Sequence, residues 1–102
     1  MTHRFVSVAL LELRESMLDY ESKEQGLGAR FLREVEVTVD RIISNPEAWR
    51  RLSPRTRRCL VHDFPFGVFY QIRRDEILIV AVMDLTALLW AQGYPRRSWV
   101  LG

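Results

Sequence analysis

The chain has 102 residues, of which 48% are hydrophobic, and it carries a formal net charge of +2. This length predicts a single domain over residues 1–102 with one buried core, and the composition excludes a disordered chain. No apolar run approaches the roughly 18 to 20 residues of a membrane helix, and charged residues interrupt the N-terminal apolar stretch, so we expect a cytoplasmic protein without a membrane partner.

The N-terminal region predicts a short strand followed by a helix. Arg4–Ser7 can form the strand, and Ser7 is placed to cap the helix that begins at Val8. We expect this helix to end near Gly26 and Gly28, which permit a tight reversal of the chain. Its apolar stripe consists of Leu10, Leu13 and Met17, flanked by Leu11, Leu18 and Tyr20.

A second helix is predicted from about Ala29 to Asn45. It ends there because Pro46 follows, and the residue before a proline is disfavoured in the helical conformation. The short link Gln25–Gly28 predicts that the two helices form an antiparallel hairpin. The apolar stripe of the second helix consists of Phe31, Leu32, Val35, Val39, Ile42 and Ile43.

Three strand-like runs follow a polar loop at residues 47–56, in which one helical turn is predicted at Ala48–Arg51. The runs are Arg57–Phe64, Val68–Arg73 and Glu76–Met83, and the last is apolar on both faces, as is typical of a central strand. Short connections between them predict an antiparallel meander. The fold class is therefore α+β, with a short N-terminal strand and a two-helix antiparallel hairpin packed on a small antiparallel sheet, in the order β-α-α-β-β-β.

Cys59 is the only cysteine of the chain. The chain can therefore form no intramolecular disulfide and no thiol-rich metal site, and we expect neither a metal nor a cofactor. His62 follows three residues later, which on a strand places the two side chains on opposite faces. We therefore interpret Cys59 as a small buried side chain and not as a nucleophile.

Characteristic short stretches accompany this order of elements. They are Glu12–Ser16, Tyr20-Glu21, Gly26–Glu36, Arg41-Ile42, Asn45–Trp49, Arg57-Arg58, Phe64-Pro65-Phe66, Val68-Phe69-Tyr70 and Asp75–Met83. Through their order and spacing, residues 8–83 resemble the RelE/ParE toxin superfamily. The ParE-like branch, which includes plasmid stabilisation toxins, is resembled more than the RelE-like branch.

The resemblance implies a growth-inhibiting bacterial toxin of a type II toxin–antitoxin pair. Such a toxin is neutralised by a small antitoxin whose C-terminal segment wraps around it. ParE-like members act on DNA gyrase, whereas RelE-like members cut messenger RNA on the ribosome with basic and aromatic or histidine side chains. The fold alone does not choose between these activities.

Residues 84–102 depart from the family's pattern. Members commonly continue after the last strand with a His, one or more Arg, and then a Pro and a Trp. Here Asp84 follows Met83, the next residues are mostly apolar, and Pro95 and Trp99 come only later. We therefore treat residues 84–102 as an atypical C-terminal segment, in which Leu85–Trp90 can form one or two helical turns.

Basic residues are concentrated in the second half of the chain. Residues 1–47 hold six basic and nine acidic residues, residues 48–102 hold nine and four, and arginine supplies 14 of the 15 basic residues. Because arginine binds carboxylates and phosphates through a rigid fork, the cluster predicts a surface that docks an acidic antitoxin tail, gyrase or nucleic acid. The alternative is a solvated loop paired with acidic residues of the helical hairpin. The cluster consists of Arg50, Arg51, Arg55, Arg57 and Arg58.

Cleavage of RNA at a 2′-hydroxyl requires a base, an acid and cations that neutralise the phosphate. Arg58 and Arg73 can supply positive charge, and Asp84 can serve as a base, so these three are the catalytic candidates. His62 is interpreted as a structural histidine of the sheet. Since no assembled acid and base pair is visible, we expect the protein to bind rather than to catalyse; an enzyme with this sequence would be an mRNA endoribonuclease.

The C-terminal segment carries large apolar side chains, namely Leu88, Leu89, Trp90 and Trp99. They can close the open face of the small sheet, or they can form an exposed patch for the antitoxin, the target or a second copy in a homodimer. Three hypotheses therefore stand. The leading one is a ParE-like toxin that binds a protein target; the others are a ribosome-dependent RelE-like ribonuclease and an inactive homologue that keeps only antitoxin or self association.

Overall fold

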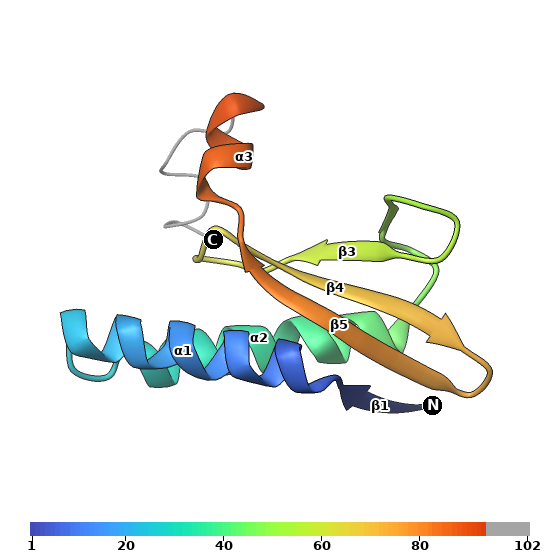
Figure 1. Cartoon of the computed structure of the whole chain (residues 1–102), viewed down its shortest axis with the longest axis horizontal. Helices are drawn as coiled ribbons and strands as arrows, with labels where there is room; N and C mark the ends of the chain where they lie inside the picture. The colour runs from blue at the N-terminus through green and yellow to red at the C-terminus, as the bar shows by residue number, and fades with distance from the viewer. Residues whose placement is uncertain (94–102) are drawn as a thin grey trace.

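The computed structural model describes residues 1–93 and confirms the α+β fold (Figure 1). Its elements follow in the order β1 (Thr2–Phe5), α1 (Ser7–Lys23), α2 (Leu27–Ser44), β2 (Arg50–Arg51), β3 (Arg57–Leu60), β4 (Phe66–Arg73), β5 (Glu76–Asp84) and α3 (Thr86–Ala91). The strands form one sheet in the order β1-β5-β4-β3-β2, with α1 and α2 along one side and α3 at the other (Figure 1). None of the helices within residues 1–93 has the length and apolar character needed to cross a membrane.

The sheet is mixed and not wholly antiparallel. β3, β4 and β5 form the predicted antiparallel meander, and β2 extends it by an antiparallel pair that was not predicted. β1 instead pairs with β5 in the parallel direction, starting with Thr2 opposite Glu76. β1 also begins two residues before the predicted Arg4–Ser7. No hairpin joins β1 to β5, so no turn in the sequence fixes the direction of this pair. β5 lies between β1 and β4, as its two apolar faces predict.

Two local predictions in the connecting segments are wrong. The cap of α1 is Val6 and not Ser7, because Val6 stays extended and its N–H donates to the Ile79 carbonyl oxygen at 3.0 Å, which continues the pairing of β1 by one residue. The helical turn expected at Ala48–Arg51 is replaced by β2, whose two residues pair with the start of β3. Long-range pairing thus overrides local preference at both places.

The turn between α1 and α2 is built around two glycines with different roles. Gly26 adopts a φ of 87°, a left-handed conformation that glycine favours. The Glu21 carboxylate accepts hydrogen bonds from the backbone N–H groups of Gly26 at 2.8 Å and Gly28 at 3.0 Å. Gly28 belongs to α2 and is buried, and a Cβ atom there would lie 2.6 Å from the Met17 carbonyl oxygen. Its missing side chain therefore allows the two helices to approach closely.

The apolar stripe predicted for α2 is confirmed, whereas the stripe predicted for α1 is wrong in part. The buried apolar residues of α2 are Phe31, Val35, Val39 and Ile42. The α1 residues that pack on the core are Ala9, Leu13, Met17 and Tyr20. Leu10, Leu11 and Leu18 are each more than half exposed. Apolar residues surround much of α1, so its sequence does not define which side faces the sheet.

An aromatic cluster joins the helical hairpin to one end of the sheet. Its members are Tyr20, Phe31, Phe64 and Phe66, with ring centroids 4.8 to 6.0 Å apart. The rings meet in tilted and edge-to-face arrangements, which stabilise such pairs by about 0.5–1.5 kcal/mol beyond burial. Because the rings come from α1, α2 and the turn into β4, the cluster fixes these elements to one another.

α3 covers the same end of the sheet from the opposite side. Leu85 and Leu89 are buried against Leu60 and Phe69. Gly67 makes room for this contact, because a Cβ atom at that position would lie 2.8 Å from Leu85 Cδ1. The helical turns predicted at Leu85–Trp90 are thus present as α3, and of the two roles left open for this segment Leu85 and Leu89 have the first, closing part of the sheet face.

Candidate functional site

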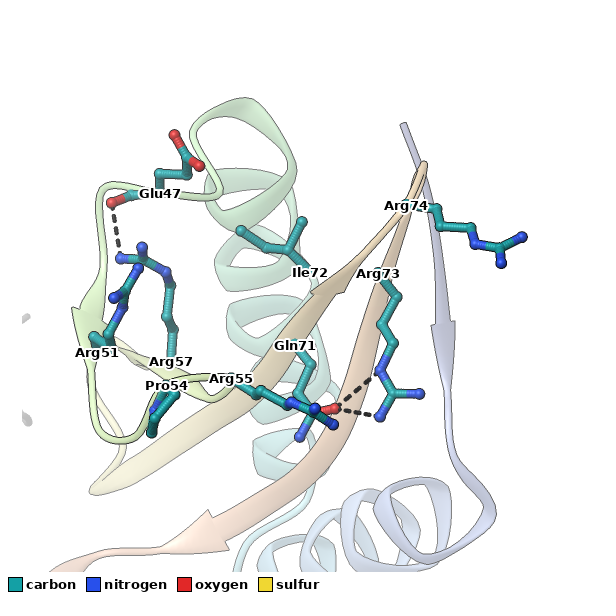
Figure 2. A pocket seen from close by; sticks show the side chains of 9 residues that line it. All are labelled: Glu47, Arg51, Pro54, Arg55, Arg57, Gln71, Ile72, Arg73 and Arg74. Atoms are coloured by element: carbon teal, nitrogen blue, oxygen red, sulfur yellow. Dashed lines mark hydrogen bonds between the residues drawn. The ribbon is translucent and has the colours of Figure 1, made fainter.

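A hollow of about 790 Å³ lies at the end of β4 that is farthest from α3 (Figure 2). It is bounded by the loop before β3 on one side and by the last residues of β4 on the other. We call it the arginine hollow. Its lining residues are Glu47, Arg51, Pro54, Arg55, Arg57, Gln71, Ile72, Arg73 and Arg74.

Side chains of β3 and β4 hold the loop that forms one wall. Arg57 Nη1 donates hydrogen bonds to the carbonyl oxygens of Glu47 at 3.0 Å and Trp49 at 2.9 Å. The Tyr70 hydroxyl donates to the Pro46 carbonyl oxygen at 2.5 Å, and burial raises the pKa of Tyr70 to about 12 despite the opposing effect of Arg57. Arg57 is thus part of the frame of the hollow as well as part of its charge.

The opposite wall orders a second guanidinium. Arg73 Nε and Nη2 donate to Gln71 Oε1 at 3.2 and 2.7 Å (Figure 2). Gln71 Nε2 donates to Thr56 Oγ1 at 3.1 Å. Arg74 follows in the turn between β4 and β5 with a φ of 49°. A polar chain therefore links the two walls and places Arg73 at the rim.

The charge of the arginine hollow is not neutralised within residues 1–93. Five of its nine lining residues are arginines, and Glu47 is the only acidic one. The ion pairs of this part of the chain lie elsewhere, between Arg4 and Glu76 and between Lys23 and Asp19. The alternative of a loop paired with acidic residues of the helical hairpin is therefore not seen. Such a concentration of guanidinium groups attracts carboxylates or phosphates.

A smaller, acidic hollow of about 220 Å³ lies at the other end of the sheet. Its lining residues are Glu15, Ser16, Asp19, Tyr20, Lys23, Phe66 and Asp84. Burial, together with the charges of Asp84 and Asp19, raises the pKa of Tyr20 to about 12. Asp84 Oδ1 accepts hydrogen bonds from the backbone N–H and the hydroxyl of Thr86 at 2.8 and 2.5 Å, so it fixes the start of α3.

The three catalytic candidates are not brought together. Asp84 pairs with one end of β4, and Arg73 lies at the other end. The eight residues of β4 separate them by roughly 20 Å, at about 3.3 Å per residue. Arg58 lies between these ends and is only 7% exposed. Within residues 1–93, only Arg73 of the three candidates lies at the arginine hollow, whose one acidic lining residue is Glu47.

The two remaining chemical groups of interest also lie apart from the hollow. His62 is exposed in the turn after β3, which makes the interpretation as a buried sheet histidine wrong. Cys59 is buried as predicted, and burial raises the pKa of its thiol. A buried thiol with a raised pKa is a poor nucleophile.

The predicted arginine cluster is divided by the structure. Arg51, Arg55 and Arg57 line the hollow, whereas Arg50 is exposed on β2 outside it. Arg58 lies close to Gly67 on the face that α3 covers. Alternation along β3 explains the division, because neighbouring residues of a strand point to opposite faces.

The large apolar residues of the C-terminal segment are divided in the same way. Leu89 is buried on the side of α3 that contacts the sheet, whereas Leu88 is 40% and Trp90 is 63% exposed. Trp99, which the sequence also suggests as a binding residue, lies outside the described residues. α3 thus covers part of the sheet with one side and exposes apolar side chains on the other.

The predicted site residues did not include five lining residues of the hollow, namely Glu47, Pro54, Gln71, Ile72 and Arg74. Gln71 and Ile72 join the site because β4 continues beyond the first residue of β3, so that the end of β4 borders the hollow. No sequence signal indicated this overhang, because the predicted run Arg57–Phe64 is longer than the predicted run Val68–Arg73.

Comparisons with known proteins agree with this architecture. The sequence matches the family model described as ParE toxin of type II toxin-antitoxin system, parDE, over residues 9–84. Among solved structures, the chain is similar to one titled "Chromosomal ParDE TA system from P. aeruginosa", with 20% identity and a TM-score of 0.61 over 82% of this chain and 95% of that chain. At this level of identity the likeness shows the fold. No curated protein sequence matches the chain.

Proposed function

The chain belongs to the ParE toxin family, whose model matches residues 9–84, and from this premise we propose that it is the toxin of a type II toxin–antitoxin pair that acts by binding a protein target such as DNA gyrase. A cognate antitoxin is its second partner and neutralises it. The pair operates in the cytoplasm and inhibits growth when the antitoxin is lost, as in plasmid stabilisation.

The arginine hollow is the observation that supports binding as the mode of action. Hydrogen bonds hold two of its five guanidiniums, those of Arg57 and Arg73, and no ion pair within residues 1–93 neutralises the five. A ribonuclease also needs a proton acceptor near the scissile phosphate. Asp84, the candidate for that role, lies at the far end of β4. Five guanidiniums beside a single carboxylate, that of Glu47, support recognition over cleavage.

The first experiment is controlled expression of the full chain in bacteria without an antitoxin. We expect growth arrest with filamentous cells and induction of the DNA-damage response, because blocked gyrase leaves broken DNA. Coexpression with the product of the neighbouring antitoxin gene should restore growth. Unimpaired growth at a verified expression level would contradict the proposal that the chain is an active toxin, and it would favour an inactive homologue.

Primer extension on translated messages from the same cells separates the two toxin activities. A gyrase-binding toxin leaves the messages intact during the arrest. New cleavage sites that depend on the chain would replace our proposal with a ribosome-dependent endoribonuclease.

A further inference from the structure

The outer face of the helical hairpin carries a group of exposed apolar side chains. α1 and α2 lie side by side along one side of the sheet, and the outer face is the one turned away from the sheet (Figure 1). Single exposed apolar residues are ordinary on protein surfaces, but a contiguous group marks an interaction surface. The exposed apolar residues of the hairpin, each 45 to 63% exposed, are Val8, Leu10, Leu11, Leu18 and Val37.

α1 arranges its share of these residues along one line. Leu11 and Leu18 are seven residues apart and therefore point in the same direction within roughly 20°. Leu13 packs on the core from the opposite side of the helix. Arg14 and Glu15 are exposed to either side of the line. α1 thus presents an apolar line flanked by one basic and one acidic side chain.

α2 presents the same three kinds of side chain. Val37 is 45% exposed, and Arg33 and Glu36 are exposed within about one turn of it. The ion pairs within residues 1–93 include neither these two charged residues nor Arg14 and Glu15 of α1. The charges of both outer faces are therefore available to a partner.

The close approach at Gly28 determines how the two helices are aligned. A Cβ atom at Gly28 would lie 2.6 Å from the Met17 carbonyl oxygen and 2.9 Å from Glu21 Cβ. Gly28 therefore lies level with the middle of the turn of α1 between these two residues. Because the helices run in opposite directions and rise equally per residue, this one level fixes all the others.

This alignment makes the outer face of the hairpin self-complementary. Counted from Gly28, Val37 lies level with Leu11 and Arg33 lies level with Glu15, each within about one residue. A two-fold axis parallel to the helices places α1 of one copy over α2 of the other at the same level, so each contact forms twice. Apolar side chains then meet apolar side chains, and carboxylates meet guanidiniums.

The remaining two charges fit the same arrangement. Arg14 lies seven residues before Glu21 and therefore on the side of α1 that is nearer α2. Glu36 lies about two turns after Gly28, on the side of α2 that is nearer α1. The two-fold axis brings these two sides together. Arg14 of one copy therefore approaches Glu36 of the other.

The charges favour a second copy over a lipid surface. Amphipathic helices that lie on membranes carry mainly lysine and arginine on their polar face. α1 carries four acidic residues and only two basic ones. An anionic membrane would therefore repel this helix.

We propose that the outer face of the helical hairpin binds a second copy of the chain, with α1 of each copy packed on α2 of the other. No lining residue of the arginine hollow belongs to α1 or α2, so the dimer presents two accessible hollows. A homodimer through residues 84–102 would use a different surface. The contacts across the interface are Leu11 with Val37, Glu15 with Arg33, and Arg14 with Glu36.

Sedimentation equilibrium of the full chain over a range of concentrations tests the proposal. We expect an equilibrium between monomer and dimer. The single variants E15R and R33E each place like charges at both symmetry-related contacts, so each should raise the Kd of the dimer about tenfold or more. R50E changes an exposed arginine of β2 and is the control, which should leave the Kd unchanged.

A charge swap tests the pairing itself. The double variant E15R/R33E restores both pairs with reversed polarity, so its Kd should return to within about threefold of that of the unchanged chain. An equimolar mixture of E15R and R33E should form heterodimers, because each mixed pair unites opposite charges at both contacts. A nonspecific apolar association would show neither rescue.

Three results would overturn the proposal. The first is a chain that stays monomeric at every concentration. The second is a dimer whose Kd changes in neither E15R nor R33E, which would place the interface elsewhere. The third is a monomeric chain that cosediments with phosphatidylglycerol vesicles and loses this binding in Leu11→Glu, which would assign the face to a membrane.

Discussion

The two ends of the β4–β5 hairpin are built in opposite ways. At one end α3, Leu85 and Leu89 close the sheet from one side, and the aromatic cluster of Tyr20, Phe31, Phe64 and Phe66 closes it from the other. At the other end the strands of the sheet have unequal lengths, and arginines surround the hollow. The closed end stabilises the fold, whereas most of the charge at the open end contributes little to its stability.

This difference separates residues that stabilise from residues that bind. Apolar packing at the closed end lowers the free energy of the folded state through burial. Most arginines of the hollow are exposed, and exposed charges contribute little to stability. Substitutions at the two ends should therefore have different effects on the stability and on the binding of the same protein.

The largest effect is expected at the closed end. Phe31 is fully buried and contacts three other rings. The substitution Phe31→Ala should lower the free energy of unfolding by about 3–5 kcal/mol, as is typical for a buried phenylalanine. Urea unfolding followed by circular dichroism measures this change. Val37→Ala, on the exposed side of the same helix, is the control and should change it by less than about 1 kcal/mol. Equal losses in the two variants would contradict the proposed division.

Arg57 is the exception that sharpens the comparison, because it is an arginine of the open end that also stabilises. Removing its guanidinium leaves the carbonyl oxygens of Glu47 and Trp49 without their donor. Arg57→Met keeps much of the aliphatic stem and should lower the free energy of unfolding by about 1.5–3 kcal/mol. Arg55→Met, an exposed arginine of the same loop, should change it by less than about 0.5 kcal/mol. Equal changes in the free energy of unfolding for the two substitutions would contradict this account.

Each end also contains one tyrosine with a raised pKa, the half-buried Tyr20 at the closed end and the fully buried Tyr70 near the open end. Burial raises the pKa of Tyr20 and of Tyr70 from 10.0 to about 12. The unfolded chain loses these protons near pH 10, whereas the folded chain keeps them, so their stabilising contribution is complete below about pH 10 and is lost as the pH rises through about 12. The variants Tyr20→Phe and Tyr70→Phe should each flatten this decline. Urea unfolding between about pH 9 and pH 12 measures it. If the free energy of unfolding of the double variant falls with pH as steeply as that of the unchanged chain, other groups cause the decline.

The smallest effect on stability is expected from the exposed arginines. R73E/R74E should change the free energy of unfolding by less than about 0.5 kcal/mol, even though it removes the ordered contact between Arg73 and Gln71. The same urea experiment measures it. A loss above about 2 kcal/mol would mean that the open end also stabilises the fold, and the separation of the two ends would fail.

Most of the fold could be predicted from the sequence because the relevant signals are local. The stripe of α2 and the proline after Asn45 fix that helix, and the apolar residues on both faces of β5 place it inside the sheet. The stripe of α1 was ambiguous, since Leu10 and Leu11 offer a second apolar side that the sheet does not cover. The direction of β1 was not predictable because residues far along the chain provide its partner.

The candidate site was predictable in composition but not in shape. Clustered arginines indicated an anion-binding surface, yet Arg50 and Arg58 fall outside the hollow because strand alternation and the cover of α3 separate them from Arg51 and Arg57. Ile72 could not be identified, since its role depends on where β3 ends relative to β4. That boundary is set by the loop closing on Thr56, a tertiary feature without a sequence signature.

The central claim is that the chain acts by binding a protein and not by catalysis. A supercoiling assay with purified DNA gyrase and increasing amounts of the chain tests it most directly. We predict inhibition that grows with the molar ratio of chain to gyrase and levels off once the gyrase subunits are saturated, as for a stoichiometric binder. Undiminished supercoiling at a large molar excess of the chain would contradict the account.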